Sequence, residues 1–181
     1  MKKLLAVALL LTSAQMAMAE QVVINTKNST MVLEVEKGKQ PQYVYYGASL
    51  SDTDLKHLQA PRGGRMDAYP AYGMNCPAEA AFAMKHADGN MSTELYTTDI
   101  ERQGDLTRIV LKDPVYPTSV TLFYKAYQDE DMIETWTEVR NGEAKPVTLT
   151  QFASISLPIR RGNVWLSHFH GSWGNETRLD L

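Results

Sequence analysis

Apolar residues along this chain recur mainly at every second position or in short β-branched and aromatic runs, and helical periodicity is nearly absent. Within residues 118–127, Val120, Leu122, Tyr124 and Ala126 share one face of an extended strand, while a second, partly apolar set occupies the other face. Strands that are partly apolar on both faces are typical of packed sheets. We therefore predict an all-β, antiparallel sandwich.

Turn-forming residues divide the chain into nine expected strands. The strongest hairpin signals are Asp88-Gly89 and Asn141-Gly142, because these residue types tolerate the positive φ that a type I′ turn requires. Trp136 lies between threonines in one clear strand, and we expect it in the core. The expected strands are residues 21–25, 31–35, 42–46, 92–98, 105–112, 119–127, 132–140, 148–156 and 163–167.

The segment from Pro77 to His86 meets the criteria for a helix as well as those for a strand. Proline at a first helical position and strong helix formers favour a helix. Ten residues make only about three turns, however, which is marginal without tertiary support. The Asp88-Gly89 signal that follows invites pairing with residues 92–98, and we expect a strand with that partner. Residues 51–76 contain many loop formers and are expected to be a long, ordered excursion between strands.

The first nineteen residues have the pattern of a secretory signal peptide. Lys2 and Lys3 precede a short apolar run, and small residues end the pattern at Ala19, where we expect cleavage. The apolar run is too short to span a bilayer, although an uncleaved anchor remains the alternative. We expect residues 20–181 to form one domain that is secreted or periplasmic and is not bound to a membrane after cleavage.

The remaining 162 residues carry 16 basic and 21 acidic side chains and no basic cluster, so nucleic acid is not an expected partner. No pair of carboxylates has the sequence context of a glycosidase acid and nucleophile. His168 and His170 share one face of a strand, but no third metal ligand is signalled. We expect no catalytic residue, no metal site and no cofactor in this chain.

Aromatic residues are the remaining candidates for binding. Trp165 and Trp173 bracket a polar segment that is broken by glycines. An indole ring there could lie against the C–H face of a sugar while its N–H donates to a hydroxyl group. The alternative is that both rings pack against a neighbouring domain.

Four stretches give the chain a specific resemblance to a known family. They are AYPAYG (68–73), AFAMKHADG (81–89), the run from Leu111 to Pro158, and WLSHFHGSWGNETRL (165–179). Their order and content resemble the amino-terminal domain of the family 36 glycoside hydrolases, which are α-galactosidases.

The resemblance implies an antiparallel β-supersandwich that packs against a (β/α)8 barrel, which in the family carries both catalytic aspartates. The chain would then be the non-catalytic amino-terminal piece of a secreted, retaining α-galactosidase that removes terminal α-linked galactose from oligosaccharides. Without the barrel it is expected to be inactive.

The resemblance also implies that loops of this domain reach the rim of an active site, including that of a neighbouring subunit in a homo-oligomer. The expected galactoside-binding residues are Trp165 and Trp173, together with Asp67, Tyr69 and Tyr72 of the long loop. A free-standing carbohydrate-binding module without hydrolase activity is the alternative function.

Overall fold

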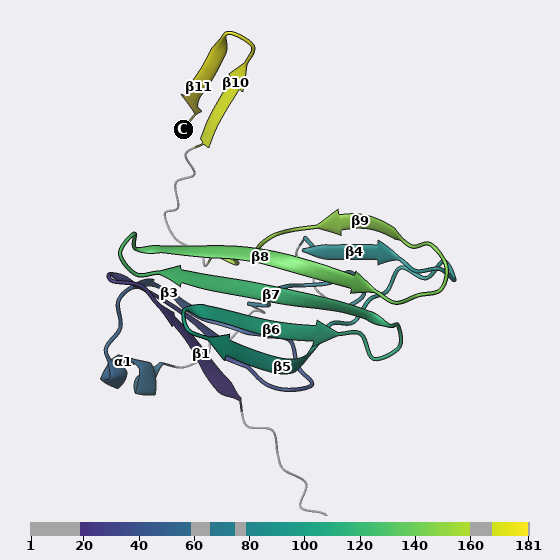
Figure 1. Ribbon diagram of the computed structural model, residues 1–181, viewed down its shortest axis with the longest axis horizontal. Helices are drawn as coiled ribbons and strands as arrows, with labels where there is room; N and C mark the ends of the chain where they lie inside the picture. Colours follow the sequence, from purple (N-terminus) through teal and green to yellow (C-terminus); the bar gives the residue numbers. More distant parts are fainter. Residues whose placement is uncertain (1–18, 59–65, 75–78, 160–167, 181) are drawn as a thin grey trace, which may run out of the picture.

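The computed structural model describes residues 19–58, 66–74, 79–159 and 168–180 of the chain. These residues form eleven strands and one short helix (Figure 1). No helix among them is both long and apolar enough to cross a bilayer. The elements are β1 (Glu20–Asn25), β2 (Ser29–Val35), β3 (Gln42–Ala48), α1 (Asp52–His57), β4 (Phe82–Lys85), β5 (Tyr96–Gln103), β6 (Leu106–Lys112), β7 (Thr118–Tyr127), β8 (Met132–Asn141), β9 (Thr148–Phe152), β10 (His168–Ser172) and β11 (Asn175–Asp180).

Two antiparallel sheets form the body of the molecule. The first has the strand order β1-β2-β3 and the second the order β5-β6-β7-β8. The two sheets face each other, with β1 in contact with β7 (Figure 1). The pairs β4-β9 and β10-β11 form two further antiparallel sheets of two strands each. The prediction of an all-β, antiparallel sandwich is confirmed.

The core lies between the two larger sheets. The side chains of Val120, Leu122, Tyr124 and Ala126 on β7 are at most 6% exposed and belong to this core, as their alternation predicts. Val22, Leu33 and Val35 from the first sheet, together with Leu95, Ile109 and Leu111 from the second half of the chain, are 0–1% exposed and complete the centre of the core.

Trp136 lies on the outer face of the four-stranded sheet, and the expectation that it is a core residue is wrong. It stands directly opposite Phe123 in the β7–β8 pairing, so both side chains share the face turned away from the core. The two rings stack with centroids 4.7 Å apart, and Trp136 is half-buried. The register with β7, which a single strand does not reveal, decides its side.

The strand identity of residues 82–85 is confirmed, but both expected hairpin pairings around the strongest turn signals are wrong. Gly89 has φ +91°, and His86 N donates to Asn90 O over 2.8 Å, so the turn forms. The residues after this turn do not pair with β4, however, because β4 pairs with β9. At the other signal, Gly142 N donates to Pro117 O over 2.8 Å, and the chain crosses from β8 to β4 rather than folding back onto β8.

The long excursion between β3 and β4 is confirmed. It opens with α1, which the sequence did not predict and which begins at a capping box formed by Ser51 and Asp54. Its later residues lie along β3, where Asp67 forms a bridge with Gln42 and Tyr43 N donates to Met66 O over 2.8 Å. A second bridge joins Ala71 to Phe82 of β4. The loop therefore connects the first sheet to the β4-β9 pair.

Asp131 ties the β7–β8 turn to the β1–β2 turn. Thr26 Oγ1 and Asn28 N both donate to Asp131 Oδ1, the latter over 3.0 Å, and Asn28 Nδ2 donates to Oδ2 over 3.2 Å. These donors, the Thr26 hydroxyl foremost, hold the pKa of Asp131 below its ordinary value of 3.8.

A carboxyl group with a lower pKa in the folded chain stabilises it above the unfolded-state pKa, and this contribution is lost as the pH falls through the folded-state value. We therefore expect Asp131→Asn to lower the urea midpoint at pH 7 and to lose most of its difference from the parent near pH 3. Asp129→Asn, at an exposed position in the same turn, is the control. A difference from the parent that is equal at both pH values would contradict this role.

Candidate functional site

Asp67 and Tyr69 lie inside the molecule, in the part of the long loop that follows β3. Asp67 is 4% exposed, and Gln42 Nε2 donates to its Oδ1. Tyr69 is 1% exposed, and its hydroxyl donates to Ala153 O over 2.8 Å. Burial raises the pKa of the Tyr69 phenol above its ordinary value of 10.0. Both side chains hold the loop against the sandwich, and neither presents a surface to a ligand of this domain.

Tyr72 projects from the same loop into solvent and is 54% exposed. Its backbone is fixed on both sides, because its N–H donates to Phe82 O over 2.9 Å and its carbonyl accepts from Thr93 N over 2.9 Å. Gly73 follows with φ +113°, and a Cβ atom there would lie 2.9 Å from the Cα of Ser92. The structure thus separates Tyr72 from the buried Asp67 and Tyr69 and presents its ring on a backbone that is held by two hydrogen bonds.

Trp173 is fully exposed, at 100%, in the turn between β10 and β11. Gly174 completes this turn with φ +74°, which favours glycine. In Figure 1 the hairpin stands apart from the other sheets. Trp165 and the expected strand at 163–167 lie outside the described residues. The structure therefore does not test whether the two indoles lie together.

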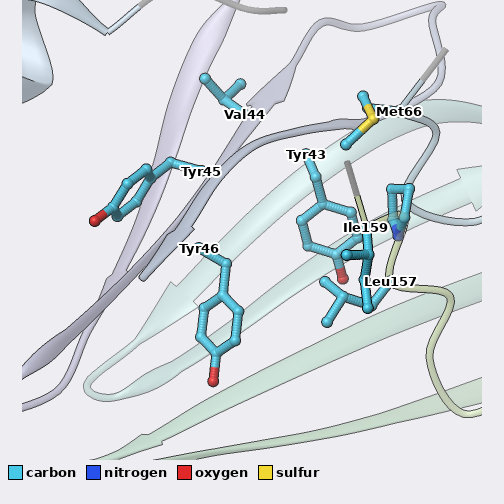
Figure 2. A pocket seen from close by; sticks show the side chains of 8 residues that line it. Tyr43, Val44, Tyr45, Tyr46, Met66, Leu157 and Ile159 are labelled. Atoms are coloured by element: carbon cyan, nitrogen blue, oxygen red, sulfur yellow. The ribbon is translucent and has the colours of Figure 1, made fainter. Parts of the chain in front are cut away.

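A groove that the sequence did not indicate lies between β3 and the segment after β9. It has a volume of about 310 Å³ and is lined by Tyr43, Val44, Tyr45, Tyr46, Met66, Leu157, Pro158 and Ile159. Figure 2 shows Leu157 and Ile159 beside the ring of Tyr43, with Met66 at the same end. The Tyr43 hydroxyl lies 3.3 Å from that of Tyr124, and burial raises the pKa of Tyr43 to about 12. The groove is apolar and meets the core at this tyrosine.

His86, Glu143 and Thr93 form a buried polar cluster at the end of β4. His86 Nδ1 lies 2.8 Å from Glu143 Oε1, and Nε2 lies 2.9 Å from Thr93 Oγ1. The order of carboxylate, imidazole and hydroxyl resembles that of a hydrolytic triad. Thr93 is 0% exposed, however, and the imidazole is stacked beneath Tyr116 with the ring centroids 3.5 Å apart. A substrate cannot reach this hydroxyl, and the cluster is structural.

Comparison with known protein families identifies the chain. Residues 39–180, which make up most of the chain, match the model of the Glycosyl hydrolase family 36 N-terminal domain. The chain belongs to glycosyl hydrolase family 36. The resemblance read from the sequence is confirmed, and the search of curated proteins found no significant match.

Solved structures of α-galactosidases share the fold. The α-galactosidase AgaA of Geobacillus stearothermophilus, solved in complex with raffinose, is 19% identical with a TM-score of 0.76, and the match covers 89% of this chain and 27% of that one. AgaB of the same organism is 18% identical with a TM-score of 0.75, covering 93% and 27%. The α-galactosidase of Lactobacillus brevis is 16% identical with a TM-score of 0.73, covering 88% and 26%.

This family 36 chain spans about a quarter of the length of these solved relatives. Its described residues contain no group of three or more histidine, cysteine, aspartate or glutamate side chains placed to hold a metal ion. Candidate features for recognition in the described part of the chain include the exposed rings of Tyr72 and Trp173 and the apolar groove.

Proposed function

We propose that this chain is the amino-terminal, non-catalytic domain of a secreted, retaining α-galactosidase that hydrolyses terminal α-linked galactose from oligosaccharides. The observation that carries the proposal is the match of residues 39–180 to the family 36 N-terminal domain, with a sandwich that superposes on about a quarter of the length of solved α-galactosidases. The catalytic aspartates belong to a (β/α)8 barrel elsewhere in the polypeptide.

The chain alone is proposed to be inactive. Several of its carboxylates serve the fold: Asp113 accepts from three backbone N–H groups at 2.7–2.8 Å, and Glu143 accepts from Ala87 N over 3.0 Å. A carboxylate whose oxygens accept from backbone N–H groups is not free to act as a nucleophile. Hydrolysis of an α-galactoside by the 181-residue chain would contradict this part of the proposal.

Trp173 is proposed to stand on the rim of the active site of the same or a neighbouring subunit, together with Trp165. Its full exposure leaves the indole face open to a sugar ring. Tyr72 is the third exposed ring proposed for this rim. For Asp67 and Tyr69, burial favours an indirect role, in which they hold the loop that carries Tyr72.

Secretion to the periplasm or beyond is proposed from the pattern of residues 1–19. It is supported by the position of β1, which begins at Glu20, directly after the expected cleavage site. Mass spectrometry of the mature protein should find an N-terminus at Glu20. Recovery of an intact Met1 terminus from the cell envelope would contradict cleavage.

The rim role of Trp173 predicts a kinetic change without a loss of stability. In the full-length polypeptide, Trp173→Ala is expected to lower kcat/KM for raffinose about tenfold, the equivalent of a lost contact of about 1.4 kcal/mol. The effect should fall on KM, while the free energy of unfolding changes by less than about 0.5 kcal/mol, because the side chain is fully exposed.

Trp173→Phe is the matched variant, because a phenyl ring can still stack on a sugar but lacks the indole N–H donor. It should retain most of the activity. An unchanged KM in Trp173→Ala would reject the rim role. Activity that is absent even in the parent polypeptide, with measurable galactoside binding by calorimetry, would instead favour a carbohydrate-binding module.

A further inference from the structure

An exposed, uncharged apolar strip runs along β9 and the segment after it. Residues 146–159 contain no charged side chain, although Lys145 and Arg160 flank them. We call residues 149–159 the apolar strip. Its large apolar side chains are all more than one-third exposed: Leu149 (44%), Phe152 (47%), Ile155 (40%), Leu157 (37%) and Ile159 (67%).

The neighbouring strand β8 shows how a solvent-facing strand of this domain is built. Its outward positions include the exposed, charged side chains Glu134, Glu138 and Arg140. Charged side chains on outward positions keep a sheet soluble and prevent association through its edges. The apolar strip lacks them, so its composition fits a surface that is covered.

The backbone of β9 is paired with another strand along one edge. In the part of the chain that the structure describes, β4 is its one strand partner. On the side of β8, contact is made through a side chain, because Thr137 Oγ1 donates to Ala153 O over 3.0 Å. A short edge strand with exposed apolar residues is a liability unless another surface covers it.

The strip continues into the groove at β3. Leu157 and Ile159 line this cavity of about 310 Å³ and lie beside the ring of Tyr43 (Figure 2), and Tyr46 lines the cavity as well. Tyr46 is 56% exposed and extends the same apolar surface onto the three-stranded sheet. The strip and the groove therefore share Leu157 and Ile159 and form one continuous apolar surface.

We propose that the apolar strip and the groove are the surface on which the catalytic domain of the same polypeptide docks. The inference rests on the proposed function only in taking this chain as one part of a longer α-galactosidase. Solved relatives match over only 26–27% of their length, which leaves a large folded partner in each of those chains. In Figure 1 the β10–β11 hairpin also extends beyond the β8–β9 side of the sandwich, where the strip lies.

Carbene footprinting of the polypeptide made from its native gene tests this proposal, because carbenes label exposed apolar side chains. Val115 (78% exposed) and Met132 (52% exposed) are internal references elsewhere on the surface. The exposed fractions of Phe152, Ile155 and Leu157, divided by those of the references, give the labelling ratio that is expected for an uncovered strip. If the strip lies at the centre of an interface, the measured labelling ratio should be at least about fivefold lower. This protection should not change on dilution.

Two results would overturn the proposal. Labelling of the strip in proportion to its exposure in the isolated domain would show that nothing covers it. Protection that is lost on dilution, together with a sedimentation change from dimer to monomer, would assign the surface to a second copy of the chain. A raffinose hydrolysis assay on the same preparation separates the two proposals. If the preparation hydrolyses raffinose and the strip is labelled, only the docking proposal is overturned. If the strip is protected and raffinose is not hydrolysed, only the proposed activity is overturned.

A pair of variants adds an independent readout. Phe152→Arg places a charge in the middle of the strip, at a side chain that is 47% exposed and lies outside the core cluster. We expect it to restore labelling of Ile155 and Leu157 and to split the thermal unfolding of the polypeptide into two transitions. Val115→Arg, with the same change of charge, should do neither. Equal behaviour of the two variants would contradict docking at the strip.

Discussion

Replacing Tyr69 with alanine is expected to lower the free energy of unfolding of this domain by about 3–5 kcal/mol, the range for removal of a large aromatic side chain from a core. Tyr69 is 1% exposed and lies in the core cluster, beside Ala68 and Ala71 of the same loop. Alanine would leave a cavity at the point where the loop, the sandwich and the β4-β9 pair meet. Urea denaturation of parent and variant measures the difference.

Tyr69→Phe separates the ring from the hydroxyl. Ala153 O accepts from Thr137 Oγ1 over 3.0 Å as well as from Tyr69, so it keeps one donor when the phenol is removed. The loss should therefore lie near the lower end of the range for one hydrogen bond, about 0.5–1 kcal/mol. KM for a galactoside should remain unchanged in Tyr69→Phe if this side chain acts only by holding the loop. A raised KM with normal stability would instead restore Tyr69 as a substrate contact.

The alternation along single strands was enough to predict the layers and much of the core. Val120, Leu122, Tyr124 and Ala126 lie on the buried face of β7 because a period of two fixes which side chains share a face. What could not be predicted is which strand lies beside which. Asn141-Gly142 has the chemistry of a hairpin turn, yet β9 pairs with β4, because the partner of a strand depends on the edge that lies beside it in three dimensions and not only on the turn before it.

The candidate site was also predicted only in part. Family resemblance pointed to the loop and to the terminal hairpin, and the structure exposes the rings of Tyr72 and Trp173 there. It could not show that Asp67 turns inward, since that follows from the pairing of the loop with Gln42 of β3. The sequence does not indicate the groove for a related reason, because its lining residues, 43–46, 66 and 157–159, meet only in three dimensions.

The second large effect is expected at Glu143, where alanine should cost about 3–5 kcal/mol. The Glu143 side chain is 7% exposed and the His86 side chain is 0% exposed. Its carboxylate accepts from Ala87 N over 3.0 Å and lies 2.8 Å from His86 Nδ1. Truncation would leave both groups without an acceptor, at about 1–3 kcal/mol for each buried donor, which agrees with the cost of removing one partner of a buried pair.

The double variant His86→Phe/Glu143→Leu tests whether the loss arises from the stranded polar groups or from lost packing. Phenylalanine can keep the stacking on Tyr116, whose ring lies 3.5 Å from the imidazole, and leucine fills the space of the carboxylate. Because apolar replacement of both partners is often close to neutral, the double variant should be more stable than Glu143→Ala. Glu138→Ala, at an exposed position on β8, is the control and should change stability by less than about 0.5 kcal/mol. A double variant as unstable as Glu143→Ala would show that the loss does not come from the unpaired imidazole, and the cluster would then act mainly by anchoring Ala87 N.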